Sequence, residues 1–349
     1  MVNVQAEAVW LGERIMERTM KRISAIGVAM LTAGVLVGCS AQTEQEAKML
    51  VEPTRWPGRT MEFFAGTSKF LLKTGRISSH RRVTVEEGVD IDTWVIRSRL
   101  SDRQAGRDGS LFESKLTRGT VVLLHPLMAG KAWFLGLGER LADRGWDVVL
   151  MDLRGHGYST GSYTTWGARE KRDVKAVMDE LLKTEPIHDR IYVCGSSMGA
   201  GVAIQYAAID SRCKGVIAIA PPIAAVDVFR KMLFLLPRTR FDKAVDRAGE
   251  LADFDPAEAS ALAAAEKLHC PLLVVQGKWD MLVSVDEAEA IFDAADTPKK
   301  YIQLQFAGHG AEVGRTAWLA GQMDTLAAME GETAPRIVTM RLTRADMPE

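Results

Sequence analysis

Residues 192–201 read YVCGSSMGAG and carry a GxSxG pattern with Ser197 at its centre. Apolar residues before the pattern predict a short strand, and the small and apolar residues 198–209 after it predict a buried helix. A strand that turns sharply into a helix brings two backbones together, so Gly195 and Gly199 leave no room for a Cβ. Because such a turn pushes the central side chain outward, we predict that Ser197 is a nucleophile.

A serine hydroxyl needs a base to take its proton and an acid to orient that base. Of the six histidines, His309 is the best base, because it lies in a glycine-flanked loop directly after a predicted strand. Asp280 is the best acid, because it lies in the loop that follows another apolar strand. Two secondary candidates remain: Asp227 after the preceding strand, and Asp286, which is typical of a helix N-terminus.

The order Ser197, Asp280, His309 along the chain resembles the nucleophile, acid, base order of the α/β hydrolases. Residues 152–159, DLRGHGYS, follow a predicted strand and resemble that family's DxRGHGxS turn. In the family this turn is structural, so the resemblance implies that His156 braces the loop and is not a second base. These motifs identify the fold far more specifically than they identify a substrate.

The loop after a further predicted strand reads HPLMAG over residues 125–130 and resembles the family's HGx oxyanion loop. It departs from the family pattern at Pro126, which replaces the usual glycine and has no N–H to donate. The resemblance therefore implies that the backbone N–H groups of Leu127 and Met198 bind the oxyanion.

Strands and helices alternate through residues 80–330, the stretch that the resemblance covers, and no linker or repeat interrupts them. We expect one catalytic domain of the α/β-hydrolase fold, with a mostly parallel eight-stranded sheet and helices on both faces. Residues 223–269 contain no predicted strand and are expected to form a small helical cap. Its apolar run 232–236 indicates the core of a cap helix, with an acyl pocket as the alternative. Residues 331–349 are expected to be a C-terminal tail.

The N-terminal region resembles a bacterial lipoprotein signal peptide. Lys21 and Arg22 precede an apolar run, 23–38, which ends in the lipobox-like sequence LVG before Cys39. The run is short for a membrane-spanning helix and fits the apolar part of a signal peptide. Residues 1–39 are therefore expected to be a signal peptide with its lipobox. Because Met20 directly precedes the basic pair, residues 1–19 are expected not to be translated.

The lipobox implies that diacylglyceryl attached to Cys39 anchors the protein in a membrane. Ser40 follows the cysteine in place of aspartate, and by analogy this favours the outer membrane, facing the periplasm. Residues 40–79 are expected to be a tether and an N-terminal extension, with 42–59 as the polar tether. The expected location is the bacterial cell envelope.

Composition excludes several functional classes. A net charge of −1 argues against nucleic acid as a partner, and the chain has no CxxC or HExxH pattern for a metal. No cofactor is expected. We expect a lipid-anchored serine hydrolase that cleaves carboxylic esters or thioesters of small molecules or lipids. The alternatives are an amidase or peptidase with the same triad, and a non-catalytic binding lipoprotein on a hydrolase fold. Dehalogenases and epoxide hydrolases place aspartate where this chain has Ser197.

The remaining cysteines bear on the redox environment. Cys213 and Cys270 precede consecutive predicted strands, which are parallel neighbours in the family, so the resemblance places both thiols at one edge of the sheet. Neighbouring strands lie about 4.8 Å apart, near the range of about 4.4–6.8 Å that a disulfide can bridge. A disulfide and a pair of buried thiols both remain open, and Cys194 is expected to be buried beneath the turn.

Overall fold

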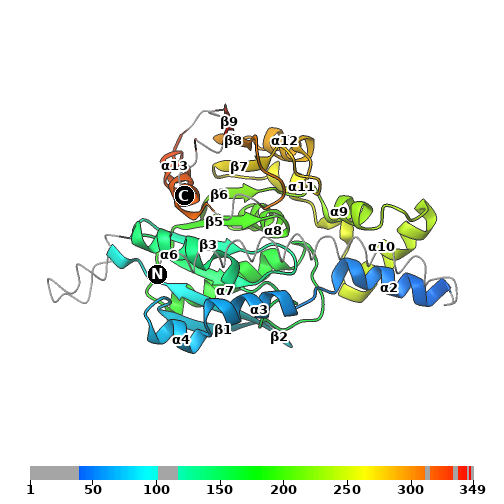
Figure 1. Cartoon of the computed structure of the whole chain (residues 1–349), viewed down its shortest axis with the longest axis horizontal. Helices are drawn as coiled ribbons and strands as arrows, with labels where there is room; N and C mark the ends of the chain where they lie inside the picture. The colour runs from blue at the N-terminus through cyan, green and yellow to red at the C-terminus, as the bar shows by residue number, and fades with distance from the viewer. Residues whose placement is uncertain (1–38, 101–116, 311–314, 333–336, 344–345, 347–349) are drawn as a thin grey trace.

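A nine-stranded sheet forms the centre of the molecule (Figure 1), and its strand order is β1-β2-β4-β3-β5-β6-β7-β8-β9. The computed structural model describes residues 39–100, 117–310, 315–332, 337–343 and 346. The strands are β1 (Ser79–Glu86), β2 (Val89–Ile96), β3 (Thr120–Leu124), β4 (Asp147–Met151), β5 (Ile191–Ser196), β6 (Cys213–Ile219), β7 (Leu272–Gly277), β8 (Lys299–Leu304) and β9 (Ile337–Leu342). Strands β1 and β2 are antiparallel, as are β2 and β4, and the pairs from β4 to β9 are parallel.

Helices cover both faces of the sheet (Figure 1), because its central strands are apolar on both sides. In β3, Val122 and Leu124 belong to the core beneath one layer, and Val121 and Leu123 belong to the core beneath the other. The first layer contains α7 (Glu170–Thr184), α8 (Met198–Ala207), α11 (Ala261–Ala265) and α12 (Val285–Ala294). The second contains η3 (Lys131–Phe134), α6 (Leu135–Asp143) and α13 (Thr316–Ala328). The predicted fold class is confirmed.

The number of strands corrects the prediction. We expected eight strands and a C-terminal tail from residue 331, but β9 lies within that tail and extends the sheet in parallel beside β8. Residues 337–342 read IVTMRL, a short run rich in β-branched and apolar residues. The edge of β8 offers this run a full set of backbone partners, which a strand at the end of a chain needs in order to form.

The region expected to be a polar tether is folded, which is a second correction. It forms α2 (Cys39–Val51), α3 (Trp56–Ala65) and α4 (Ser68–Lys73). Helix α2 lies along α10 (Arg238–Ala252) of the cap (Figure 1), where Arg247 Nε donates to Glu44 Oε2 over 2.6 Å. An apolar stripe on α2, at helical spacing, is buried: Ala47, Leu50 and Val51. The proposed signal peptide lies outside the described residues up to residue 38, and in the part that is described no helix is long and apolar enough to cross a membrane.

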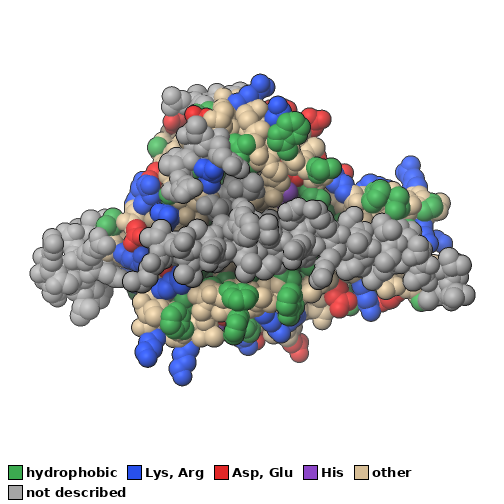
Figure 2. All heavy atoms as spheres, in the orientation of Figure 1, with side chains coloured by type: hydrophobic (Ala, Val, Ile, Leu, Met, Phe, Trp, Pro, Cys, Tyr) green, Lys and Arg blue, Asp and Glu red, His purple; other side chains and the backbone are tan. Residues whose placement is uncertain are grey.

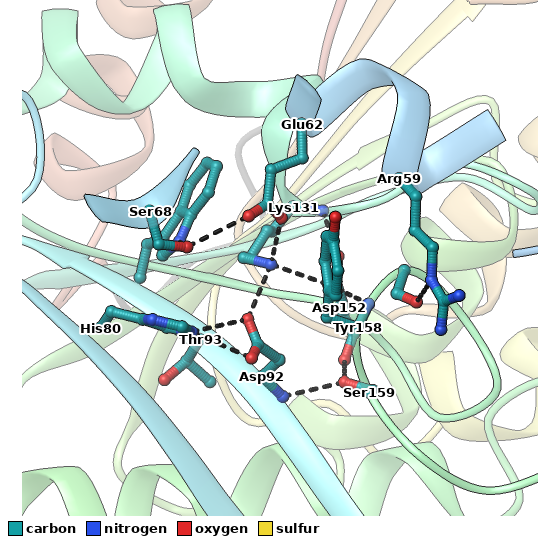
Figure 3. A network of polar contacts seen from close by, with 12 residues as sticks. Arg59, Glu62, Ser68, His80, Asp92, Thr93, Lys131, Asp152, Tyr158 and Ser159 are labelled. Atoms are coloured by element: carbon teal, nitrogen blue, oxygen red, sulfur yellow. Dashed lines mark hydrogen bonds and ion pairs between the residues drawn. The ribbon is translucent and has the colours of Figure 1, made fainter. Parts of the chain in front are cut away.

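A buried lysine holds α3 against the sheet (Figure 3). The Lys131 ammonium has no exposed surface and contacts the carboxylates of Glu62 from α3, Asp92 from β2 and Asp152, at 2.6, 2.7 and 2.9 Å. It also lies over the ring of Trp94, 4.7 Å from the ring centroid. A charge that is buried this deeply persists only when several partners compensate for lost hydration.

The charges in this cluster depend on one another. Burial lowers the pKa of Lys131, but its three carboxylate neighbours outweigh this effect and raise the pKa above its ordinary value. Burial raises the pKa of Asp92, but the hydrogen bond from His80 and the ion pair with Lys131 lower it to about 2. The contribution of Asp92 to stability is therefore complete above the ordinary pKa of 3.8 and is lost as the pH falls towards 2.

The segment expected to be a cap, 223–269, contains α9 (Ala225–Met232), α10 and η4 (Pro256–Glu258), whereas α11 at its end packs on α8 and α12 and belongs to the first helix layer. A bridge between Ala224 and Ser260 closes its base. The apolar run 232–236 is divided, since Leu233 is buried while Phe234 and Leu235 are exposed. The core interpretation therefore holds for part of the run only.

The two cysteines considered for a disulfide are buried, unbridged thiols. Cys213 opens β6 and Cys270 lies two residues before β7, so they stand at the same end of neighbouring strands. Burial, together with the hydrogen bond and proximity of the Cys270 thiol, raises the pKa of Cys213 well above its ordinary value. Of the two alternatives, a disulfide and a pair of buried thiols, the structure has the pair of thiols. Cys194, in the middle of β5, is also buried.

Replacing Lys131 should destabilise the fold strongly. Lys131→Met leaves three buried carboxylates without their cation, so we expect the free energy of unfolding to fall by about 3–5 kcal/mol. The loss should be largest near neutral pH and shrink in acid, because protonation removes the charges that Lys131 had compensated. Urea denaturation as a function of pH measures it. The control, Lys69→Met on an exposed site, should change stability by no more than about 0.5 kcal/mol; equal effects of the two substitutions would contradict the analysis.

Candidate active site

Three loops meet at the carboxyl ends of the parallel strands, where sites form in open α/β sheets. Ser197 follows β5, Asp280 follows β7 and His309 follows β8. These are the residues that the sequence predicts as nucleophile, acid and base. The structure brings all three side chains into one hydrogen-bonded chain.

Ser197 occupies a strained turn between β5 and α8. Its backbone has φ 52° and ψ −120°, a conformation that residues other than glycine rarely adopt. A Cβ on Gly195 would lie 2.1 Å from the carbonyl oxygen of Gly199, and a Cβ on Gly199 would lie 2.2 Å from that of Leu124. Both glycines are therefore required by close backbone contact, as the sequence predicts. The turn directs the Ser197 hydroxyl out of the sheet.

The hydrogen-bonded chain runs from serine to carboxylate through one imidazole. His309 Nε2 lies 2.9 Å from Ser197 Oγ, and His309 Nδ1 lies 2.7 Å from Asp280 Oδ2. The second oxygen of Asp280 accepts the backbone N–H groups of Leu282 and Val283 at 2.8 and 2.9 Å. Burial raises the pKa of Asp280, but the hydrogen bond and charge of His309 and these two N–H donors lower it below its ordinary value. Asp280 thus remains an anion that can orient an imidazolium.

Gly277, which the sequence analysis did not single out, allows the loops that carry Asp280 and His309 to approach each other. A Cβ on Gly277 would lie 2.7 Å from the carbonyl oxygen of Ala307 and 2.8 Å from that of Gly308. The loops are joined further by the Trp279 N–H, which donates to the Ala307 oxygen over 2.9 Å. The signal in the sequence is a glycine at the last position of a buried strand, three residues before Asp280.

The loop expected to form the oxyanion site is held by His125. The Leu153 N–H donates to His125 Nε2 over 2.9 Å, so Nδ1 carries the proton and donates to the Pro126 carbonyl over 2.8 Å. Burial lowers the pKa of His125, which agrees with a neutral ring. In the described part of the chain, the backbone N–H groups of Leu127 and Met198 have no protein acceptor. Both groups therefore remain candidates for binding an oxyanion.

The side chains of the DxRGHGxS turn contact other groups within the protein. Arg154 makes a bidentate ion pair with Asp173, with both N···O distances at 2.6 Å. His156 is fully buried, lies 5.0 Å from the His125 ring and hydrogen-bonds the Arg154 carbonyl. Arg154 also lines a cavity of about 350 Å³ beside Glu86, which contains none of the three candidate catalytic residues. The side chains of this turn brace the loop, and the lining of the cavity, which includes none of the candidate catalytic residues, argues against it as the site of chemistry.

The alternative acids lie elsewhere. Asp227 lies in the first turn of α9 and Asp286 in the first turn of α12, where each faces the positive end of a helix dipole. Neither hydrogen-bonds to His309. Among the described residues, no group of three or more histidine, cysteine or acidic side chains could hold a metal ion.

Sequence comparison finds one matching family. The sequence profile of the serine aminopeptidases of family S33 (Hydrolase_4) matches residues 115–248. YqkD, an uncharacterised protein of Bacillus subtilis, is 30% identical over 190 residues, which cover 52% of this chain and 62% of YqkD. RP471, an uncharacterised protein of Rickettsia prowazekii, is 23% identical over 168 residues, which cover 48% of this chain and 56% of RP471. The chain thus spans about three fifths of the length of these relatives.

Comparison of structures identifies the fold. The Pyrococcus furiosus esterase Pf2001 superposes with a TM-score of 0.57 at 21% identity, covering 81% of this chain and 98% of the esterase. An acylaminoacyl peptidase of Pyrococcus horikoshii superposes with a TM-score of 0.52 at 16% identity, covering 72% of this chain and 40% of the peptidase. Together with the sheet order and the family match over residues 115–248, these similarities show that the chain has the α/β-hydrolase fold.

Removing the ring that holds the oxyanion loop should impair both stability and turnover. His125→Phe leaves the Leu153 N–H buried without an acceptor, so unfolding should become easier by about 1–3 kcal/mol. If the site is hydrolytic, the displaced loop should lower kcat by about 10- to 100-fold. Thermal melts and initial rates measure the two effects. The control, His269→Phe at an exposed site, should be close to the wild type, and an unchanged kcat in His125→Phe would refute a positioning role.

Proposed function

We propose that this protein is a serine hydrolase that cleaves carboxylic esters or thioesters through an acyl-enzyme. The observation that carries the proposal is the position of His309, which lies within hydrogen-bond distance of both Ser197 Oγ and Asp280 Oδ2. The same chain of contacts on the strained turn favours a catalyst over a binding lipoprotein on a hydrolase fold. A binding protein would have no need to maintain that strain.

The mechanism follows from the three side chains. Ser197 Oγ attacks the acyl carbonyl while His309 Nε2 takes its proton. Asp280 stabilises the imidazolium through Nδ1, and the N–H groups of Leu127 and Met198 stabilise the tetrahedral oxyanion. His309 returns the proton to the leaving alkoxide or thiolate. Water then attacks the acyl-enzyme with His309 as its general base, and Ser197 is regenerated.

Apolar side chains beside the triad support an ester over an amide substrate. Met281 is 94% exposed and Trp279 is 65% exposed, and both flank Asp280 on the acid loop. An aminopeptidase needs an anionic partner for the substrate ammonium, whereas this loop presents apolar surface that fits an acyl chain. The S33 match and the peptidase superposition keep an amidase or peptidase as the second candidate. A chain-length series of p-nitrophenyl esters, compared with aminoacyl p-nitroanilides, distinguishes the two.

The triad assignment is tested by substitution. Ser197→Ala should abolish labelling by a fluorophosphonate probe and lower kcat by on the order of 10⁴ or more without unfolding the protein. His309→Ala should be nearly inactive, and Asp280→Asn strongly impaired, because asparagine favours the wrong imidazole tautomer. Ser196→Ala and Asp227→Asn are the matched controls and should retain activity. Labelling that survives in Ser197→Ala but disappears in Ser196→Ala would overturn the nucleophile assignment.

We further propose that Cys39 is acylated and that the enzyme is attached to the bacterial cell envelope, at the outer membrane facing the periplasm. The support is the lipobox-like sequence before Cys39. Wild-type protein expressed in a Gram-negative host should fractionate with membranes and incorporate labelled palmitate, while Cys39→Ser should not incorporate it. An identical mass for the two mature proteins, apart from the substitution itself, would exclude the lipid anchor.

A further inference from the structure

The two short helices before the sheet expose an unusual amount of apolar surface. Trp56, Phe63 and Phe64 on α3 are 69%, 72% and 72% exposed. Phe70 and Leu72 on α4 are 52% and 41% exposed. These five side chains occur within 17 residues of sequence, and together we call them the aromatic face. Single exposed apolar residues are common on soluble proteins, but a contiguous set of large ones marks an interaction surface.

The segment that carries the aromatic face is rich in positive charge, although Arg76, Arg81 and Arg82 pair with Glu139, Glu185 and Asp92. Between Glu52 and Glu86 the chain carries seven arginine and lysine residues and a single acidic residue, Glu62, whose carboxylate is buried against Lys131. Lys69 and Lys73 on α4 are exposed and form no ion pair within the described residues. Hydrophobic and basic side chains gather over α3 and α4 on the face shown in Figure 2.

The aromatic face is held rigid from behind. A Cβ on Gly58 would lie 2.5 Å from the carbonyl oxygen of Ala129, so α3 contacts the oxyanion loop directly. Glu62, one turn further along the same side, pairs with Lys131 (Figure 3). Arg59 Nε donates to the Gly157 carbonyl over 2.9 Å. The helix therefore presents its aromatic side chains to solvent already in place, and binding costs little conformational entropy.

We propose that the aromatic face is a membrane-docking surface that binds a bilayer containing anionic lipids. Exposed tryptophan and phenylalanine insert at the boundary between headgroups and acyl chains, and neighbouring lysine and arginine attract anionic headgroups. The absence of an exposed acidic side chain between residues 53 and 85 favours this surface over a second copy of the chain, because two such faces would repel one another.

The aromatic face follows Cys39 and helix α2 directly in the chain. Helix α2 is 13 residues long, so it spans about 20 Å between Cys39 and the segment that leads into α3. Cys39 and the aromatic face therefore belong to the same N-terminal segment, but the aromatic face is a separate, non-covalent contact that needs no acylation. Since the inner side of α3 contacts the oxyanion loop, docking would bring the catalytic loops close to lipid-borne substrates.

The test uses the full chain with Cys39→Ser as background, so that acylation cannot contribute. Flotation with phosphatidylcholine vesicles, with and without phosphatidylglycerol, measures the partition coefficient. Phe63→Ser/Phe64→Ser should lower binding by at least about tenfold, because two large apolar groups no longer insert. The matched control is Phe234→Ser/Leu235→Ser, which removes two apolar side chains that are 72% and 53% exposed on the cap and should bind like the background protein.

The electrostatic part of the proposal has its own variant. Lys69→Glu/Lys73→Glu should lower binding to the anionic vesicles by about tenfold or more and leave binding to neutral vesicles almost unchanged. Hydrolysis of a soluble ester should be the same in the Phe63/Phe64 and Lys69/Lys73 variants as in the background protein, which verifies folding and separates this proposal from the proposed activity. Equal partitioning of the Phe63/Phe64 variant and its control would overturn the docking surface. So would a concentration-dependent dimer that this variant abolishes in the absence of vesicle binding.

Discussion

The arrangement of the candidate site depends on the close approach of three backbones at the turn after β5. Gly195 contacts Gly199, and Gly199 contacts the last residue of β3, at distances that exclude a Cβ. Strand β5, which leads into the proposed nucleophile, and strand β3, which leads into the proposed oxyanion loop, therefore end at the same point. A single methyl group would separate them, and the hydroxyl of Ser197 would lose its relation to the N–H groups expected to stabilise charge.

A second constraint is electrostatic and connects distant parts of the chain. Lys131 lies at the end of the oxyanion loop, and its carboxylate partners come from α3, from β2 and from the loop after β4. Each partner is stable in the interior only because the others are present. The cluster thus makes α3 an integral part of the folded domain and leaves its opposite side free for the proposed membrane contact.

Sequence reasoning was most successful where a local pattern suffices. The central strands are apolar runs, and the polar residues directly after them lie at one edge of the sheet because parallel strands share a direction. It failed at the periphery: β9 and α2 each form by packing on a neighbour far away in the chain. The pattern of residues 40–79 is mostly polar, so a tether was a reasonable expectation. Only contact with α10 and the catalytic domain makes it a set of helices.

The sequence by itself determined the fold class and the loops on which Ser197, Asp280 and His309 lie, because periodicity and turn chemistry are properties of a few neighbouring residues. The tertiary structure alone decided that these side chains meet within 2.7 and 2.9 Å. It also decided that Lys131 is buried while Phe63 is exposed. Hydropathy predicts the opposite for both residues, and the reversal comes from a contact between Lys131 and Glu62, which are 69 positions apart in the chain.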